Sequence, residues 1–159
     1  MKKRFLFSAA LLLLLHALAQ AQQLTVQIGS EKATVLTRAD LEVLPHVKVM
    51  TTKAGTSTVF EGVALEAALE KAGVQFGESL RGKRLASCLL VEAADGYRAV
   101  IALPEIDPAF TDKQTVLAFL KDGKPLDDKE GPYRLVIPDE KRMARWVRQV
   151  TALKILDVQ

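Results

Sequence analysis

The amino-acid sequence predicts an α+β domain with a predominantly β core, because short strand-like segments outnumber helical ones. Leu24–Ile28 alternates apolar and polar residues, as a half-buried strand does. The turn residues Asp95-Gly96 separate two apolar runs, and helical spacing of apolar residues is clearest in Val63–Ala72. The chain has 159 residues, 49% of them hydrophobic, which is enough to bury one core. Without an internal repeat or a composition break, residues 22–159 are expected to form a single domain.

About seven strands are expected, most of them β-branched or apolar. Asp95 and Gly96 both favour positive φ, which predicts a tight β-hairpin at that point. The eight candidate segments for these strands are Leu24–Ile28, Ala33–Leu36, Val47–Thr52, Leu85–Ala94, Tyr97–Leu103, Thr115–Leu120, Arg134–Ile137 and Val150–Val158.

Two or three short helices complete the expected fold. Thr37 and Asp40 have the spacing of a capping box and should begin a short helix that Pro45 ends. The helix Val63–Ala72 should end at Gly73, since a residue with positive φ commonly follows a helix.

The first 21 residues have the pattern of a secretory signal peptide. A basic stretch, Lys2-Lys3-Arg4, precedes the apolar run Phe5–Leu15, and small residues at Ala19 and Ala21 offer a cleavage site. We therefore expect a periplasmic or secreted protein. The apolar run is short for a membrane span and no second one follows, so stable membrane insertion is not expected after cleavage.

Charge and cysteine content exclude several classes of function. The whole chain has 22 Lys+Arg and 19 Asp+Glu, but three of the cations lie in the leader, so the remainder is formally neutral. A neutral domain gives no reason to expect nucleic-acid binding. Cys88 is the single cysteine, and His46 is the single histidine outside the leader. A His/Cys metal cluster within one subunit is thereby excluded, and we predict no metal site.

Four segments, taken in chain order, resemble successive motifs of one family. They are "FEGVALEAALEKAGV", "VEAADGYRAVIALPEI", "VLAFLKDGKPLDDKEGPYRLVIP" and "RMARWVRQVTALKI". They resemble the molybdopterin-binding domain of sulfite-oxidase-type oxidoreductases over residues 47–158. The resemblance implies a mixed-sheet α+β fold in which a pyranopterin cofactor binds among loops. It also implies a cysteine thiolate that ligates molybdenum.

This sequence departs from the family where that cysteine would stand. The family's ligand follows a strand that corresponds to Val47–Thr52, but here "VKVMTTKAGTSTVFEG" offers only the hydroxyls of Thr51, Thr52 and Ser57. A hydroxyl is a poor replacement for a soft thiolate ligand. Cys88 lies downstream in an apolar strand, where an inert thiol is expected.

The leader gives an independent argument about the cofactor. It lacks a twin arginine, which favours export of the unfolded chain. An unfolded chain cannot carry a bound cofactor with it. We therefore expect that the protein holds no cofactor. The cofactor that the resemblance implies is molybdopterin.

The resemblance also implies that Arg142 and Arg145 contribute to the pocket for the phosphate of the cofactor. Guanidinium groups suit oxyanions because they donate two parallel hydrogen bonds. An alternative is that Arg142, Arg145 and Arg148 lie along one face of a short solvated helix and balance Asp139 and Glu140.

Positions are also expected for three residues near this segment or packed beneath it. Tyr97 and Arg98 are expected at the rim of the cleft, and Trp146 in the core.

Three functional hypotheses follow from these observations. The leading one is a non-catalytic binding module that holds a small anion, a pterin-like ligand or a periplasmic protein partner. The second is a molybdenum-cofactor-dependent oxidoreductase, or a subunit of one, with an unusual ligand set. The third is an envelope interaction domain with an empty cleft.

Overall fold

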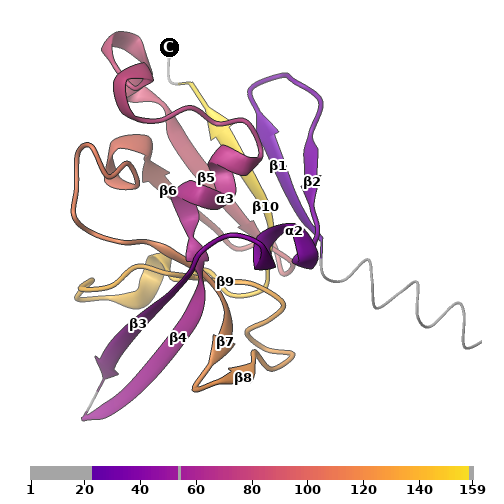
Figure 1. The fold of residues 1–159 in the computed structure, drawn as a ribbon, viewed down its shortest axis with the longest axis vertical. Helices are drawn as coiled ribbons and strands as arrows, with labels where there is room; N and C mark the ends of the chain where they lie inside the picture. Colours follow the sequence, from indigo (N-terminus) through magenta and orange to yellow (C-terminus); the bar gives the residue numbers. More distant parts are fainter. Residues whose placement is uncertain (1–22, 54, 158–159) are drawn as a thin grey trace, which may run out of the picture.

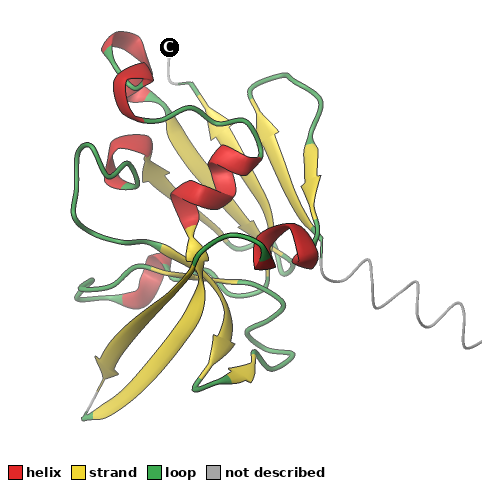
Figure 2. Cartoon of the chain, viewed as in Figure 1, coloured by secondary structure: helices red, strands yellow, loops and turns green. Residues whose placement is uncertain are grey.

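Two β-sheets carry the fold, and short helices connect their strands (Figures 1 and 2). The structure is a computed structural model that describes residues 23–53 and 55–157. Its strands are β1 (Leu24–Ile28), β2 (Thr34–Leu36), β3 (His46–Lys53), β4 (Thr56–Ala64), β5 (Cys88–Ala93), β6 (Arg98–Ala102), β7 (Val116–Lys121), β8 (Lys124–Pro125), β9 (Arg134–Val136) and β10 (Val150–Leu156). The helices are α2 (Arg38–Glu42), α3 (Leu65–Lys71) and four 3-10 turns, η1 (Gly77–Ser79), η2 (Gly82–Ala86), η3 (Leu103–Glu105) and η4 (Met143–Arg145).

Sheet A has the strand order β2-β1-β10-β5-β6 and is mixed. β1 runs parallel to β10, with Val26 opposite Leu153, so the first and last described strands lie side by side (Figure 1). The remaining neighbours in this sheet are antiparallel. This arrangement confirms the α+β class and the predominantly β, mixed-sheet core.

Sheet B is antiparallel, with the order β3-β4-β7-β8 and with β9 also paired to β7. β3 and β4 form a long hairpin that pairs from His46 opposite Val63 to Lys53 opposite Thr56. The outer part of this hairpin projects from the body of the molecule (Figure 1). The predicted strand Val47–Thr52 is therefore the outer arm of a hairpin, slightly longer than expected.

One hydrophobic cluster contains the buried side chains of both sheets. α3 joins the sheets: the backbone N–H of Leu65 donates to the Thr115 carbonyl at 2.9 Å, beside sheet B. At its other end, a side chain at Gly73 would approach Ile28 of β1 at 3.8 Å. Trp146 is 6% exposed and belongs to the same cluster, as predicted.

The local signals for helix ends were accurate. The Thr37 hydroxyl accepts the Asp40 N–H, and the Asp40 carboxylate accepts the Thr37 N–H, so the predicted capping box is confirmed. Gly73 has φ +102, and the bonds from Val74 N–H to Leu69 and from Gly73 N–H to Glu70 form a Schellman motif. The helix itself begins later than predicted, at Leu65, because residues 63 and 64 still pair in β4.

Other details of the prediction were wrong. The hairpin at Asp95-Gly96 forms, but among the two turn residues only Gly96 has positive φ; Asp95 instead accepts the Tyr97 N–H at 2.9 Å. β5 begins only at Cys88, because residues 82–86 form the 3-10 turn η2. The helix expected through Arg142, Arg145 and Arg148 is the single turn η4, so these arginines do not share a helical face.

The proposed signal peptide and Val158 lie outside the described residues. Within residues 23–53 and 55–157, no helix combines the length and apolar character that a membrane span needs.

Gly62 is expected to tolerate no side chain, because β4 and β7 approach closely there. A Cβ at Gly62 would lie 2.6 Å from the Cα of Ala118 and still closer to the Leu117 carbonyl oxygen. Gly62→Ala should therefore lower the free energy of unfolding by about 3 kcal/mol or more in urea titrations. Gly29→Ala is the control: its site is open but has φ +50, so a loss of only about 1 kcal/mol is expected. Equal losses in both variants would contradict this account.

Candidate functional site

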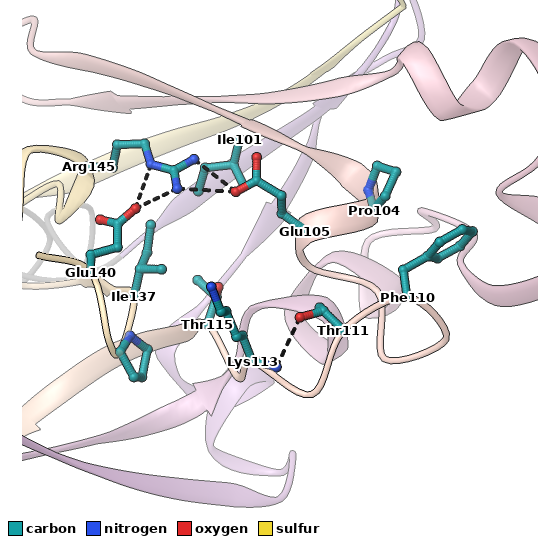
Figure 3. A pocket seen from close by; sticks show the side chains of 11 residues that line it. Ile101, Pro104, Glu105, Phe110, Thr111, Lys113, Thr115, Ile137, Glu140 and Arg145 are labelled. Carbon is teal, nitrogen blue, oxygen red and sulfur yellow. Dashed lines mark hydrogen bonds and ion pairs between the residues drawn. The ribbon is translucent and has the colours of Figure 1, made fainter.

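A cavity of about 380 Å³, the main cavity, lies where the chain leaves β6 and β9 (Figure 3). One wall comes from the end of β6, η3 and the loop that follows, and the other from the residues after β9 and from η4. Five apolar residues line it: Ile101, Pro104, Phe110, Ile137 and Pro138. Its polar lining is Glu105, Thr111, Lys113, Thr115, Glu140 and Arg145.

Arg145 lies between two carboxylates of this cavity (Figure 3). Its Nε donates to Glu140 Oε1 at 2.7 Å, and Nη1 and Nη2 both donate to Glu105 Oε2 at 3.1 Å. Nη2 also lies 2.5 Å from Glu140 Oε1. Burial lowers the pKa of the Arg145 guanidinium, but the bonds to Glu140 and Glu105 outweigh it, so this pKa lies above its ordinary value. Three of its donor nitrogens are already engaged, so an incoming oxyanion would have to compete with two internal carboxylates.

Local structure holds both carboxylates in place. Glu105 ends η3, and its Oε1 accepts the backbone N–H of Ala102 at 3.4 Å, which leaves Oε2 for Arg145. Glu140 follows Asp139, whose φ of +65 turns the chain after β9 back towards η4. The Glu140 side chain is 17% exposed, and its Oε2 is buried without a hydrogen-bond partner among the described residues.

A second buried cation, Arg134 on β9, has a structural role. Its guanidinium pairs with Glu130 and lies over Phe60 and Trp146, 5.0 Å and 5.8 Å from the ring centroids. Lys121 adds a further contact to Glu130 at 3.2 Å. Burial lowers the pKa of Arg134, although Glu130 opposes this effect. This cation is thus enclosed by protein and does not line any of the described cavities.

Two smaller cavities are also described. One, of about 180 Å³, shares Thr111, Lys113 and Thr115 with the main cavity and includes Glu66. Burial, and then the charges of Glu70 and Asp107, raise the pKa of Glu66.

The other smaller cavity, of about 260 Å³, is lined by the side chains around Tyr97 and Trp146. The Tyr97 hydroxyl donates to the Ala144 carbonyl at 2.7 Å, which fixes the ring against η4.

The structure does not bring the four predicted site residues together. Arg145 lines the main cavity, whereas Tyr97 lines the separate cavity beside Trp146. Arg98 is exposed and pairs with Glu92 at 3.0 Å on sheet A. Arg142 is exposed and forms no hydrogen bond or ion pair with another described residue.

Sequence reasoning missed most of the cavity lining. The sequence suggests for Glu140 only a role as a solvated partner of the arginines. Glu105 lies within the motif "VEAADGYRAVIALPEI", but nothing local marks it as a partner for a residue 40 positions away. Phe110 at the cavity is 51% exposed, which is unusual for an aromatic ring but not visible in the sequence.

The described residues do not offer a thiolate at the position where the resemblance implies the molybdenum ligand. Cys88 lies on β5 of sheet A and lines none of the three cavities. On the β3–β4 hairpin, the Thr52 and Ser57 hydroxyls lie 3.1 Å apart and contact each other. No group of three or more His, Cys, Asp or Glu side chains within the described ranges could hold a metal ion. The donor set present therefore does not fit a thiolate-ligated molybdenum ion.

Comparison with known proteins identifies the fold and the family. The chain resembles the crystal structure of the sulfane dehydrogenase SoxCD from Paracoccus pantotrophus, with a TM-score of 0.65 and 22% identity over 87% of this chain. It spans only 39% of the matched chain. The family model described as the oxidoreductase molybdopterin binding domain matches residues 14–159. No curated protein matches the sequence.

The protein is thus a molybdopterin-binding domain of the sulfite-oxidase type, and it belongs to the oxidoreductase molybdopterin binding domain family. This confirms the resemblance that the four sequence motifs carried. The assignment concerns fold and family, and the chemistry must be argued from the side chains.

Removing the cation between the two carboxylates should cost stability. Arg145→Met leaves Glu105 and Glu140 without their cation, and we expect a loss of about 1 to 2 kcal/mol in the free energy of unfolding at pH 7. Urea titrations of the variant and of wild type measure this difference.

Arg98→Met is the matched control for that measurement. It removes an arginine from an exposed ion pair, with Arg98 65% exposed, so a loss below about 1 kcal/mol is expected. If both variants lose the same stability at pH 7, the Arg145 contacts have no special role.

Proposed function

We propose that this chain is an exported binding module, which uses the molybdopterin-binding fold without a molybdenum ion ligated by its own cysteine. The observation that carries this proposal is the position of Cys88, on β5 and outside every described cavity. The resemblance implies that oxidoreductases of this family ligate molybdenum through a cysteine thiolate. The β3–β4 hairpin carries hydroxyl groups where the resemblance places that thiolate.

The main cavity supports a binding role. Its volume of about 380 Å³ lies within the usual range for small-molecule sites, which is about 300 to 1,000 Å³. Its lining combines apolar residues with a few polar groups, and such groups fix the orientation of a bound ligand. Arg145 is the predicted anion-binding residue at this cavity, while Arg142, Tyr97 and Arg98 lie away from it.

The leader supports a periplasmic or secreted location. Its basic start, apolar run and small residues match a signal peptide for export of an unfolded chain. Such a chain would acquire its ligand after export, from molecules available outside the cytoplasm. The ligand would then be a small molecule or a protein partner met there.

A second candidate function is a molybdenum-dependent oxidoreductase subunit. The family match over residues 14–159 favours it, and so does the 39% share of the matched chain that this domain spans. In that case the missing ligand would come from another subunit.

Metal analysis of the protein from its own host distinguishes these two functions. We expect native mass spectrometry to give an apo mass that begins at residue 22, with no pterin, and elemental analysis to give no stoichiometric molybdenum. The control is Cys88→Ala, which should leave both results unchanged. Stoichiometric molybdenum together with a pterin mass would overturn the proposal, and its loss in Cys88→Ala would make Cys88 the ligand.

A further inference from the structure

We propose that the main cavity binds a small zwitterion, a molecule with a cationic N–H donor group, an anionic group and an apolar body between them. This inference rests on the proposed function, because it assumes that the cavity is a binding site. It assigns Glu105 and Glu140 to the donor group, Lys113 to the anionic group, and the apolar wall to the body of the ligand.

The first argument is the distribution of charge around the cavity. At one end of the cavity, Glu105 and Glu140 both contact Arg145, so two carboxylates share one guanidinium group. Away from this end, Lys113 projects from the loop after η3 (Figure 3). Among the described residues, no carboxylate pairs with the Lys113 ammonium group. The cavity is therefore neutral overall but has a negative end and a positive end.

The second argument concerns the carboxylate that a ligand can reach. The Glu105 side chain is 50% exposed and lines the cavity, so an ammonium or amidinium group can donate to it without displacing Arg145. Glu140 Oε2 is buried and accepts no bond from another described residue, so the negative charge of Glu140 is only partly compensated and adds to the attraction for a cation at this end. An oxyanion at the same end would meet two carboxylates and an arginine that is already engaged.

The third argument is the shape and character of the remaining lining. Ile101, Pro104 and Ile137 give the cavity an apolar wall, and Phe110 contributes an aromatic ring that is 51% exposed. Removing apolar surface of a ligand from water at this wall contributes to binding in proportion to the area covered. Ring faces also attract cations. A ligand with an apolar or aromatic body and two opposite charges thus matches the three parts of the lining.

Three probes with the same aromatic body and different charges test the inference. They are L-phenylalanine, which is a zwitterion, 2-phenylethylamine, which is a cation, and 3-phenylpropionate, which is an anion. Binding to the full mature chain is measured by NMR titration and calorimetry at low salt. We expect L-phenylalanine to bind more tightly than either singly charged probe, with shifts at Phe110, Lys113 and Glu140.

Two variants should change the preference in opposite directions. Lys113→Met removes the positive end, so L-phenylalanine should lose its advantage over 2-phenylethylamine. Glu105→Gln/Glu140→Gln removes the negative end and frees Arg145, so 3-phenylpropionate should bind at least about tenfold more tightly than to wild type, as a charged hydrogen bond allows. A gain in affinity cannot arise from a failure to fold.

The matched controls are Lys32→Met and Glu92→Gln, which change an exposed lysine and an ion-paired glutamate outside the cavities. They should bind all three probes as wild type does. Tightest binding of 3-phenylpropionate to wild type would overturn the inference in favour of an anion site at Arg145. Failure of all three probes to bind would overturn it as well. Neither outcome bears on the molybdenum content, so the inference and the metal-free function can fail separately.

Discussion

The close approach of β4 to β7 at Gly62 is the constraint on which much of this structure depends. β4 pairs with β3 on one edge and with β7 on the other, and α3 follows it directly. The two strands pass each other where the pairing register shifts next to Gly62, at a distance that leaves no room for a side chain. Pairing with β7 continues to Ala64 opposite Val116, so α3 begins only at Leu65. α3 then joins sheet B to β1 of sheet A.

The main cavity is a consequence of that arrangement and of the contacts of Arg145. Chain segments that leave β6 in sheet A and β9 in sheet B meet beside η4, and the side chains of Glu105 and Glu140 converge there on one guanidinium group. The same ion pairs that hold the two segments together also occupy the N–H donors of Arg145. The guanidinium group of Arg145 would by itself suit an oxyanion. In the folded protein, however, its hydrogen-bond donors are already bonded to Glu105 and Glu140.

The family relationship and the site chemistry point in different directions. The sheets, the order of the motifs and the match to a solved structure all belong to the molybdopterin-binding fold. The single cysteine, however, occupies a strand away from the three described cavities, and charged side chains of both signs line the main cavity. Folds are maintained by packing, which many side chains share, whereas a metal site depends on a few donor atoms. One family can therefore contain members with different chemistry.

The sequence by itself determined the fold class, the family, the capping box at Thr37, the helix end at Gly73 and the hairpin at Gly96. These features depend on residues close together in the chain, whose spacing and backbone preferences are visible directly. Only the tertiary structure decided the parallel pairing of β1 with β10, the contact of Arg145 with Glu105, and the separation of Tyr97 from Arg145. The Arg145 contact joins residues 40 positions apart, and no local pattern encodes it. Such pairs form because packing brings distant segments together, and only then do charge and hydrogen bonding select partners.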